Sequence, residues 1–511
     1  MFSKVLSGAI VGVDGYAIHV EVDVSQGLPV FDIVGLPDSA VKESKERVKT
    51  AIKNAGYTFP IKRITVNLAP ANIRKEGPSF DLPIAVGILQ AMDIIPAEAL
   101  ESTFFTGELS LDGAIRPVSG ILPMVYSLSK EGIRKFIVPF ENRNEAGLVS
   151  DVEVVGISGL NQLVSHLTKK VIVEPSNVDV SSLFSEEENY CALDFSDVKG
   201  QENVKRALEI SAAGAHNVIM IGPPGSGKTM MAKRFPTIMT NLTLEESMEV
   251  TKIYSVSGNL KEKNALITKR PFRSPHHTSS STSLIGGGRI PKPGEISLSH
   301  NGVLFLDEMP EFYKKALEVM RQPMEDKIVT IARANSTITY PSNFMLLASM
   351  NPCPCGYYGN SNKCTCTQSE ISKYINKISG PLLDRIDIQV EASSVKYSDL
   401  EMNVKSSTSS EIKKRVIRAQ HIQKERYKNE NIRFNSELTS GLLEKYCELG
   451  ADERNILKQA FDTLGLSARA YHKICKVART IADLENCEKL NSMHLAEAIQ
   501  YRNLDRKYWN N

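Results

Sequence analysis

The stretch GPPGSGKT, residues 222–229, decides the fold of this chain. It follows the apolar run VIMI at 218–221 and precedes MMAK at 230–233, an order that predicts a strand, a glycine-rich turn and a helix. In such a P-loop, backbone N–H groups wrap phosphates, the lysine reaches the terminal phosphates and the hydroxyl residue binds Mg²⁺. A chance glycine-rich turn is the alternative, but the full spacing behind a strand favours ATP binding. The predicted binding residues are Gly222, Pro223, Pro224, Gly225, Ser226, Gly227, Lys228 and Thr229.

A second apolar run, VLFL at 303–306, ends in Asp307 and Glu308. This is the Walker B arrangement. We expect Asp307 to hold Mg²⁺ through its water shell and Glu308 to orient and polarise the attacking water, because hydrolysis needs a base in line with the γ-phosphate. Two carboxylates can end a strand by accident, but their place downstream of a complete P-loop argues for function.

The composition is that of an ordinary globular protein. The chain has 511 residues, 42% hydrophobic and 23% charged, enough for about three or four domains. The net charge of +2 neither supports nor excludes a nucleic-acid partner. The run VLSGAIVGV at 5–13 superficially resembles a signal peptide, but the alternating apolar residues over 18–24 predict strands. No other segment approaches the ~18 apolar residues of a membrane span, so we expect a cytoplasmic protein without membrane contact.

Composition divides the chain into four segments. Residues 1–170 mix short strands and helices, and 171–192, rich in Pro, Ser and Glu, are typical of a linker. Over 193–394 strands and helices alternate as in a parallel α/β nucleotide domain, and 395–511 are helical. The predicted fold class is α/β multidomain, with a parallel-sheet P-loop core, an α+β N-terminal domain and a helical C-terminal lid.

Three further polar residues follow predicted elements of the nucleotide domain. Asn351 ends a third apolar run, 344–350, where its side chain could sense the γ-phosphate. Arg385 follows a short predicted helix in GPLLDRID, and Arg469 stands at a helix start in LSARA. Taken singly, each arginine is equally well explained as a surface ion-pair partner.

The order of these motifs resembles the AAA+ ATPases, in particular their magnesium-chelatase-like branch. The resemblance implies that Asn351 is sensor 1, Arg385 the arginine finger and Arg469 sensor 2. It also implies a ring, usually a hexamer, because an arginine finger completes a neighbour's site and can be worth roughly 10³ to 10⁵ in rate. The predicted catalytic residues are Lys228, Glu308, Asn351, Arg385 and Arg469.

Two segments of this domain are candidates for DNA contact. Residues 270–300 place basic side chains among glycines and serines, which suits a mobile loop projecting into the pore of a ring. Residues 327–340 predict a β-hairpin with a turn at 334–335. Cations and hydrogen-bonding side chains are what a loop needs to follow a phosphate backbone. The alternative for both segments is a subunit contact. The basic residues of the first segment include Arg273, His276, His277, Arg289 and Lys292.

Four of the eight cysteines form a C-x-C-x₈-C-x-C pattern directly after Asn351, which suits a tetrahedral structural Zn²⁺ site. Because C-x-C is tighter than the usual C-x₂-C, free thiols are the alternative. The candidate zinc ligands are Cys353, Cys355, Cys364 and Cys366.

The N-terminal segment is similar to the proteolytic domain of Lon proteases in the stretches KEGPS at 75–79 and TGELSLDG at 106–113. That family uses a Ser–Lys dyad. Ser79 falls on the nucleophile position, whereas Leu122 stands where the lysine is expected. Without a base the hydroxyl is a weak nucleophile, so we expect a Lon-like domain without peptidase activity.

The succession of a Lon-like domain, a linker, a chelatase-like AAA+ module with a CxC…CxC insertion and a helical lid closely resembles the YifB/ComM family over essentially the whole chain. The resemblance implies an ATP-driven hexameric DNA motor that promotes branch migration in recombination and is associated with natural transformation. Its implied partners are copies of the chain itself, single-stranded or branched DNA and recombination proteins.

Three other interpretations remain. The main alternative is a protein-remodelling or chelatase-like ATPase with no DNA substrate, although a chelatase motor would need neither the Lon-like domain nor the clustered cysteines. A Lon-type protease would need the missing lysine. A non-catalytic scaffold would tolerate the loss of Glu308 and Arg385, yet both are present.

Overall fold

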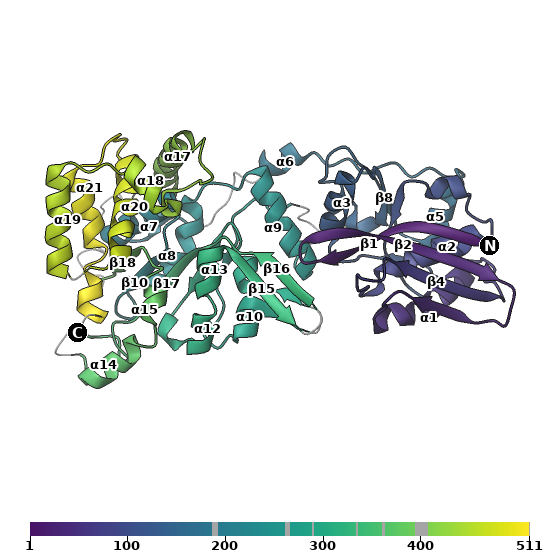
Figure 1. The fold of residues 1–511 in the computed structure, drawn as a ribbon, viewed down its shortest axis with the longest axis horizontal. Helices are drawn as coiled ribbons and strands as arrows, with labels where there is room; N and C mark the ends of the chain where they lie inside the picture. Colours follow the sequence, from purple (N-terminus) through teal and green to yellow (C-terminus); the bar gives the residue numbers. More distant parts are fainter. Residues whose placement is uncertain are drawn as a thin grey trace. The chain divides into compact units, whose positions relative to one another are not determined.

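The structure, a computed structural model, describes residues 1–185, 193–260, 266–288, 291–333, 336–359, 363–393, 407–464 and 466–509. The chain forms two compact units (Figure 1). The first comprises Met1–Glu188 and Leu244–Thr268, and the second comprises Asn189–Thr243 and Lys269–Asn511. Within the described ranges, no helix combines the length and the apolar character needed to cross a membrane.

The first unit is built on a seven-stranded sheet with the order β3-β4-β2-β1-β5-β8-β9. β1 and β2 form a long antiparallel hairpin, and β5, β8 and β9 continue the sheet in parallel. Buried residues alternate along β2, including Ile18, Val20 and Val22, which confirms the predicted strand over 18–24. The strands of this unit, with the short β6–β7 pair, are β1 Phe2–Val11, β2 Asp14–Ser25, β3 Phe31–Val34, β4 Arg63–Ala69, β5 Thr103–Phe105, β6 Glu108–Leu109, β7 Ile115–Arg116, β8 Lys135–Pro139 and β9 Glu153–Ile157.

Helices cover both faces of this sheet, because successive strand residues point to opposite sides. Phe105 and Ile137 join the core under α1, α2 and α5. Phe104 and Phe136 join the core under α3 and α4. The helices of this unit are α1 Ser39–Asn54, α2 Asp81–Ala91, α3 Ile121–Lys130, α4 Arg143–Ala146, α5 Leu160–Leu167, α6 Val180–Ser185 and α9 Leu244–Ser257.

Part of the segment expected to be a linker, 171–192, is folded. It contains α6, where Val180, Leu183 and Phe184 pack against the core under α3. The apolar residues of this short helix explain why it is drawn onto the domain. Residues 186–192 lie outside the described ranges.

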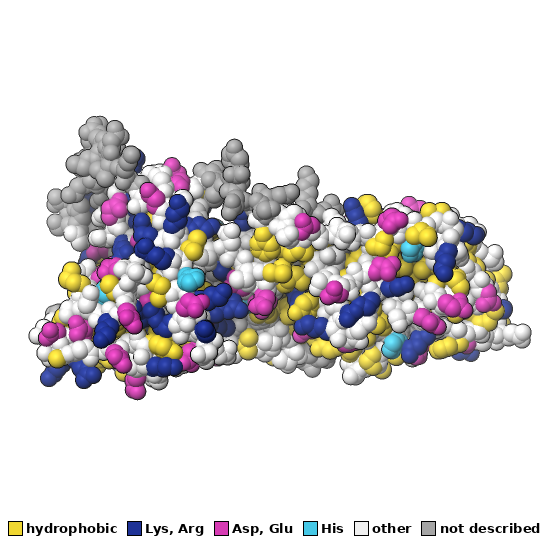
Figure 2. Space-filling model, turned by 90° about the horizontal axis from the view of Figure 1, so that it is seen from above, with side chains coloured by type: hydrophobic (Ala, Val, Ile, Leu, Met, Phe, Trp, Pro, Cys, Tyr) yellow, Lys and Arg dark blue, Asp and Glu magenta, His cyan; other side chains and the backbone are white. Residues whose placement is uncertain are grey.

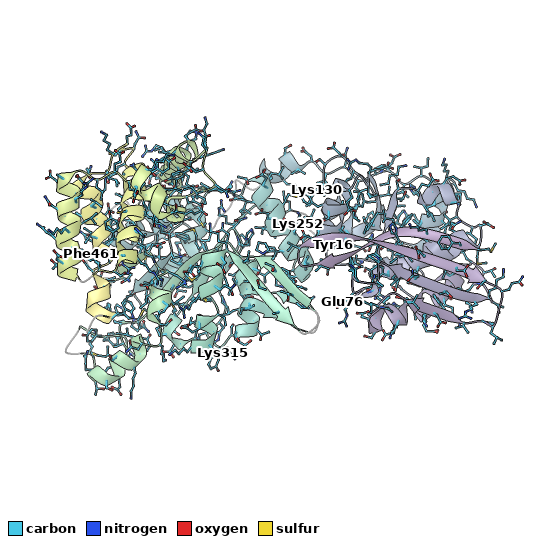
Figure 3. All side chains as sticks on the ribbon, viewed as in Figure 1. Tyr16, Glu76, Lys130, Lys252, Lys315 and Phe461 are labelled. Carbon is cyan, nitrogen blue, oxygen red and sulfur yellow. The ribbon has the colours of Figure 1, made fainter. Side chains whose placement is uncertain are left out.

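Residues 244–268 lie within the predicted nucleotide domain, 193–394, but fold with the first unit. Their helix α9 contacts α3, and Met248 and Leu266 join the apolar core there. Lys252 of α9 and Lys130 of α3, both labelled in Figure 3, lie 3.2 and 4.2 Å from the ring centroid of Tyr126. The packing partner of this segment, rather than its place in the chain, therefore decides which unit it joins.

The second unit contains a five-stranded parallel sheet with the order β11-β14-β17-β10-β18. All residues of β10, β14 and β17 are buried, which is typical of parallel strands covered on both faces. The strands of this unit, including the β12–β13 and β15–β16 hairpins, are β10 Val218–Ile221, β11 Phe272–Arg273, β12 Gly286–Gly287, β13 Lys292–Pro293, β14 Val303–Leu306, β15 Ile328–Arg333, β16 Ser336–Pro341, β17 Met345–Met350 and β18 Ile388–Glu391.

The C-terminal helices share one apolar core with this sheet, so the helical lid belongs to the same unit. Helix α20 carries much of that contact through buried residues such as Ile474, Val477 and Ile481. The helices of the second unit are α7 Glu202–Gly214, α8 Lys228–Arg234, α10 Ser281–Ile285, α11 Glu295–Leu298, α12 Lys314–Glu318, α13 Arg321–Asp326, α14 Gln368–Ile375, α15 Gly380–Leu383, α17 Ser409–Arg426, α18 Ser440–Tyr446, α19 Ala451–Leu464, α20 Ala468–Leu484 and α21 Ser492–Gln500.

Candidate functional site

The P-loop lies between β10 and α8, as the sequence predicts. Gly225 and Gly227 have φ angles of +77° and +86°, a region that favours glycine and turns the loop back on itself. Lys228 begins α8, and its Nζ donates to the backbone oxygens of Gly222 and Pro223 at 2.7 and 2.9 Å. Burial lowers the pKa of Lys228, while the nearby Asp307 carboxylate opposes that shift. The lysine is thus held inside the loop that would wrap the phosphates.

Thr229 and Asp307 meet beside this lysine. The Thr229 hydroxyl donates to Asp307 Oδ2 at 2.7 Å, and the Ser349 hydroxyl donates to Asp307 Oδ1. A hydroxyl and a carboxylate are ligands that Mg²⁺ accepts, so this pair fits a magnesium ion bound with nucleotide. Sequence reasoning missed Ser349. Its signal is a single hydroxyl within the otherwise apolar strand MLLASM.

Glu308 and Asn351 complete the group at the carboxyl ends of β14 and β17. Glu308 is exposed and has a φ angle of +53°, uncommon for a residue with a side chain. Its backbone N–H donates to Ser349 Oγ at 3.2 Å. Asn351 Oδ1 accepts from Lys228 Nζ at 3.3 Å. Strained backbone of this kind persists where the surrounding structure fixes it, often at functional sites.

The two predicted arginines do not join this group. Arg385 lies three residues before β18, at the amino edge of the parallel sheet, and its backbone oxygen accepts from Asn217 Nδ2 at 2.9 Å. Its guanidinium Nη2 lies 2.5 Å from Glu325 Oε1, and Nη1 donates to the Pro381 oxygen at 2.6 Å. Arg469 Nη1 pairs with Asp384 Oδ2 at 3.0 Å. Both arginines therefore sit at the edge opposite the P-loop.

A buried ion pair fixes the lid helix α20 next to these arginines. Lys473 Nζ lies 3.3 Å from Asp387 Oδ1 and donates to the Ile386 oxygen at 2.9 Å. Burial lowers the pKa of Lys473 to about 8, opposed mainly by Asp387. The pKa of Asp387 lies well below its usual range. Burial alone would raise this pKa, but the positive charge of Lys473 and the other nearby donors lower it by more. No local sequence signal marks this pair, because its partners come from distant parts of the chain.

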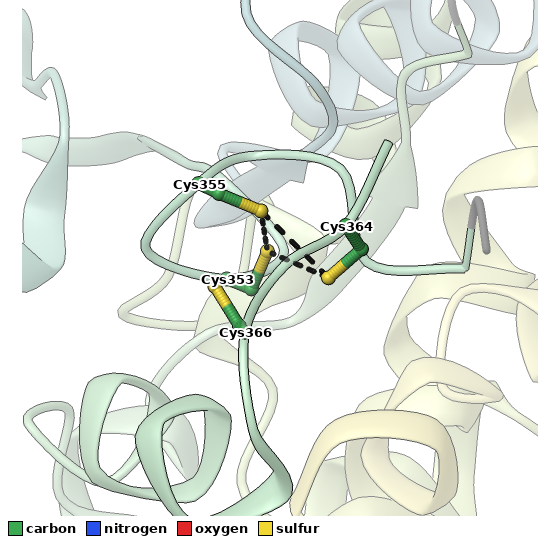
Figure 4. Close-up of side chains that lie close together, drawn as sticks. All are labelled: Cys353, Cys355, Cys364 and Cys366. Carbon is green, nitrogen blue, oxygen red and sulfur yellow. Dashed lines mark hydrogen bonds between the residues drawn. The ribbon is translucent and has the colours of Figure 1, made fainter. Parts of the chain in front are cut away.

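The four clustered cysteines converge, as the pattern predicts (Figure 4). Sγ of Cys353 lies 3.3 Å from Sγ of Cys355 and 3.9 Å from Sγ of Cys364. Sγ of Cys355 lies 3.7 Å from Sγ of Cys364, and Cys366 offers the fourth sulfur. Four thiolates at ~2.3 Å from a zinc ion in tetrahedral geometry would be about 3.8 Å apart. The donor set and its spacing therefore fit zinc.

A second group has the residue types of a metal site, but its side chains hydrogen-bond to protein groups instead. Its members are Glu485, Cys487 and His494. His494 Nδ1 accepts from the backbone N–H of Asn491 at 3.2 Å, so its proton belongs on Nε2. That nitrogen faces Glu485 Oε2 at 3.0 Å. Arg206 also pairs with Glu485, at 3.3 Å. Both ring nitrogens are thus engaged, which disfavours metal binding.

Most of the predicted pore segment, 270–300, is folded rather than a mobile loop. It forms α10, the β12–β13 hairpin and α11, because apolar residues such as Leu284 and Ile296 are buried. Arg273 Nε pairs with Glu295 at 2.6 Å. Lys292 is exposed on β13, and Arg289 lies outside the described ranges. β15 pairs antiparallel with β16, as the predicted hairpin requires, and its predicted turn at 334–335 lies outside the described ranges.

The first unit carries the two positions that distinguish a Lon-type dyad. Ser79 lies in a short 3-10 turn, and its backbone oxygen accepts from Gly107 N at 3.1 Å. Leu122 is fully buried, and its N–H donates to Glu145 Oε1 at 2.9 Å. Lys75, also buried, donates from Nζ to the Pro70 oxygen, and burial lowers its pKa. A buried apolar side chain thus stands where the resemblance to Lon proteases places the dyad lysine.

A P-loop, two carboxylates and an asparagine on one edge of a parallel sheet, with a helical lid on the same core, define an AAA+ ATPase. Three family models agree: "Magnesium chelatase, subunit ChlI" matches residues 194–400, "Subunit ChlI of Mg-chelatase" matches 20–142, and "Magnesium chelatase, subunit ChlI C-terminal" matches 406–502.

Similarity to known proteins extends over nearly the whole chain. It is 43% identical over 506 residues to Competence protein ComM of Haemophilus influenzae, covering 98% of this chain and 97% of that protein. It is 44% identical over 502 residues to protein YifB of Salmonella typhimurium, covering 98% and 96%. A stretch of 130 residues, 25% of this chain and 23% of the relative, is 28% identical to Lon protease 2 of Bacillus subtilis. The chain therefore belongs to the ComM/YifB family of magnesium-chelatase-like AAA+ ATPases.

Proposed function

We propose that the chain is an ATP-driven DNA motor that assembles as a homohexameric ring and moves branched or single-stranded DNA during recombination. Lys228 and Asn351 would bind the terminal phosphates, Thr229 and Asp307 would hold Mg²⁺, and Glu308 would polarise the attacking water. The supporting observation is that these side chains meet on one edge of the sheet, whereas the two arginines lie on the other.

Those two edges argue for a ring. The four residues of β18 span ~13 Å, so Arg385 cannot place its guanidinium on the γ-phosphate of its own P-loop. Arg469, paired with Asp384, shares that edge. A neighbouring subunit could receive both arginines at its own nucleotide, as an arginine finger and a sensor 2. Because both arginines are separated from the P-loop of their own subunit, ATP turnover should depend on assembly.

The DNA substrate is supported by the full-length similarity to a relative whose name marks it as a competence protein. The chain has no overall cationic field: its net charge is +2, and Figure 2 shows basic and acidic side chains interspersed over the face it draws. Phosphate contacts must therefore come from local groups, of which Lys292 on the β12–β13 hairpin is one candidate. The β15–β16 hairpin is the other predicted contact. DNA binding through phosphates should weaken with salt and show little base preference.

We further propose that Cys353, Cys355, Cys364 and Cys366 hold a structural zinc ion. Four protein ligands leave no open position, so the metal would shape the loop rather than take part in hydrolysis.

The Lon-like domain is proposed to lack peptidase activity. Leu122 offers no base to Ser79, and the buried Lys75 is held by the Pro70 oxygen. Degradation of an unfolded protein with ATP should be undetectable in the wild type and in Ser79→Ala alike. An activity that Ser79→Ala abolishes would refute this assignment.

The match to magnesium-chelatase models favours one alternative, a protein-remodelling or chelatase-like ATPase without a DNA substrate. Steady-state ATP hydrolysis separates the two, measured without DNA, with single-stranded DNA and with a branched junction. The motor predicts stimulation by DNA that disappears in Glu308→Gln, which serves as the blank. Turnover that is real but indifferent to every DNA would favour the alternative.

A further inference from the structure

The cysteine loop, defined here by the described residues 351–359 and 363–367, begins at the nucleotide site itself. Asn351, its first residue, accepts from Lys228 Nζ at 3.3 Å, and Cys353 follows two residues later. The Cys353 oxygen accepts from Gly356 N at 3.0 Å, which closes a tight turn. The sulfur of Cys353 also accepts from Tyr358 N at 3.3 Å. These two hydrogen bonds tie the backbone at Gly356 and Tyr358 to Cys353, so the position of Cys353 determines where the turn lies.

The same turn presses on the P-loop. Gly356 is buried with a φ angle of +85°, and a Cβ built on it would lie 2.5 Å from Cδ and 2.7 Å from Cγ of Pro224. Real Cβ atoms essentially never approach other atoms so closely. Pro224 is the third residue of GPPGSGKT. The cysteine loop thus lies against the ring of a P-loop proline, with no space there for even one added carbon.

Two points of the loop are therefore tied to the site: Asn351 to Lys228, and Gly356 to Pro224. The hydroxyl of Tyr374, on α14 beyond the last cysteine, also hydrogen-bonds the backbone of Asn351. Between these points the four sulfurs converge within reach of one ion. A metal that fixes the sulfurs would fix the loop, and with it one wall of the P-loop.

We propose that the cysteine loop is a metal-stabilised wall of the nucleotide site, so that metal occupancy sets the affinity for nucleotide. This rests on the proposed ATP and zinc sites and adds a coupling between them. Without the metal, the link between sulfurs no longer orders the turn at Gly356, and part of the binding free energy must be spent on ordering the P-loop. Nucleotide affinity should then fall by about tenfold, which corresponds to ~1.4 kcal/mol.

The test measures zinc content and nucleotide affinity separately, on the full chain without DNA. Protein as purified should contain about one zinc per chain by mass-spectrometric metal analysis. Removing it with a chelator should raise the Kd for a fluorescent ADP about tenfold, and adding Zn²⁺ back should restore the Kd. Circular dichroism before and after chelation checks that the chain stays folded.

Two glycine variants separate contact from backbone strain. Gly356→Ala should keep zinc and still weaken ADP binding, because its Cβ displaces Pro224. Gly359→Ala is the matched control: it also has a positive φ, +90°, but nothing lies within 4 Å of its Cβ, so its Kd should stay near that of the wild type. Equal Kd values for zinc-loaded and zinc-free folded protein, protein purified without metal, or an unchanged Kd in Gly356→Ala would each overturn the proposal.

This outcome is independent of the DNA assignment. A chain whose ATPase ignores DNA can still show zinc-dependent ADP affinity, and a DNA-stimulated ATPase can show none.

Discussion

Arg385 is held within its own subunit by a carboxylate that competes with the proposed target of the arginine. Glu325 Oε1 lies 2.5 Å from Nη2, and the guanidinium Nε is buried without a hydrogen-bond partner among the described residues. The side chain of Arg385 is only 14% exposed, whereas that of Glu325 is 59% exposed. An arginine finger must leave this pair to reach a neighbour's γ-phosphate.

Glu325→Gln should therefore make assembly easier. Because the Glu325 carboxylate is exposed to water, the pair is worth up to ~1 kcal/mol, so the protein concentration that gives half-maximal ATPase should fall by up to about fivefold, with kcat at saturating protein unchanged. The measurement is ATP hydrolysis as a function of protein concentration, and Asp326→Asn, a neutralised neighbour on the same helix, is the control. A lower kcat would instead make Glu325 a residue that positions the finger for catalysis.

For single residues, the sequence predicts a role when the residue and the element that positions it are neighbours along the chain. Lys228 and Asp307 are predictable because each motif contains both the reactive group and the element that positions it. Ser349 binds Asp307 from 42 residues away, and Glu325 reaches Arg385 from another helix. Such partners follow from the three-dimensional register of strands and helices, which no local pattern contains.

Helix α9 shows the same limit for an element. It is continuous in sequence with the P-loop region, yet it packs on α3 in the other unit, where Met248 joins the apolar core. The buried strands β10, β14 and β17 were predictable, because each is a short apolar run followed either by a glycine-rich turn or by a polar residue. What the sequence could not predict is which of the two cores this helix packs against.

The attachment of α9 depends on Glu145, a buried carboxylate of α4. Ser255 of α9 donates to Glu145 Oε1 at 2.5 Å, and Leu122 N and Asn142 Nδ2 donate at 2.9 and 3.1 Å. Burial raises the pKa of Glu145 above its ordinary value of 4.5, although these hydrogen bonds oppose the shift. The folded unit therefore holds this proton to higher pH than the unfolded chain does.

The sign of the pH effect follows from linkage. Because the pKa of Glu145 is higher in the folded unit than in the unfolded chain, protonated Glu145 stabilises the fold at pH values below its unfolded-state pKa. That stabilisation is lost as the pH rises through its folded-state pKa. Free energies of unfolding from urea titrations should show this loss above pH 4.5, and Glu145→Gln should remove it. Glu145→Ala should cost ~1–3 kcal/mol, because its donors are left without an acceptor. Glu141→Gln, an exposed neighbour, should behave as the wild type; a wild-type slope in Glu145→Gln would refute the assignment.

For the whole molecule, the separation of Arg385 and Arg469 from the P-loop makes a prediction about mixtures of subunits. Arg385→Ala should bind ATP but turn it over about 10³-fold more slowly, and Glu308→Gln should also be inactive. If each active site combines Glu308 of one subunit with Arg385 of its neighbour, mixed rings contain intact sites. With random 1:1 mixing, half of the subunits carry Glu308 and half of their neighbours carry Arg385, so about a quarter of wild-type ATPase activity should return.

The control replaces Glu308→Gln in the mixture by the double variant Glu308→Gln/Arg385→Ala, so that no subunit supplies the arginine. That mixture should stay inactive, because every subunit lacks Arg385 and no active site can receive it from a neighbour. Its ring composition otherwise matches that of the first mixture. If the first mixture is as inactive as its components, Arg385 does not act across the subunit boundary. The placement of the arginines would then no longer support a ring, and the P-loop edge and the arginine edge of the sheet would serve separate functions.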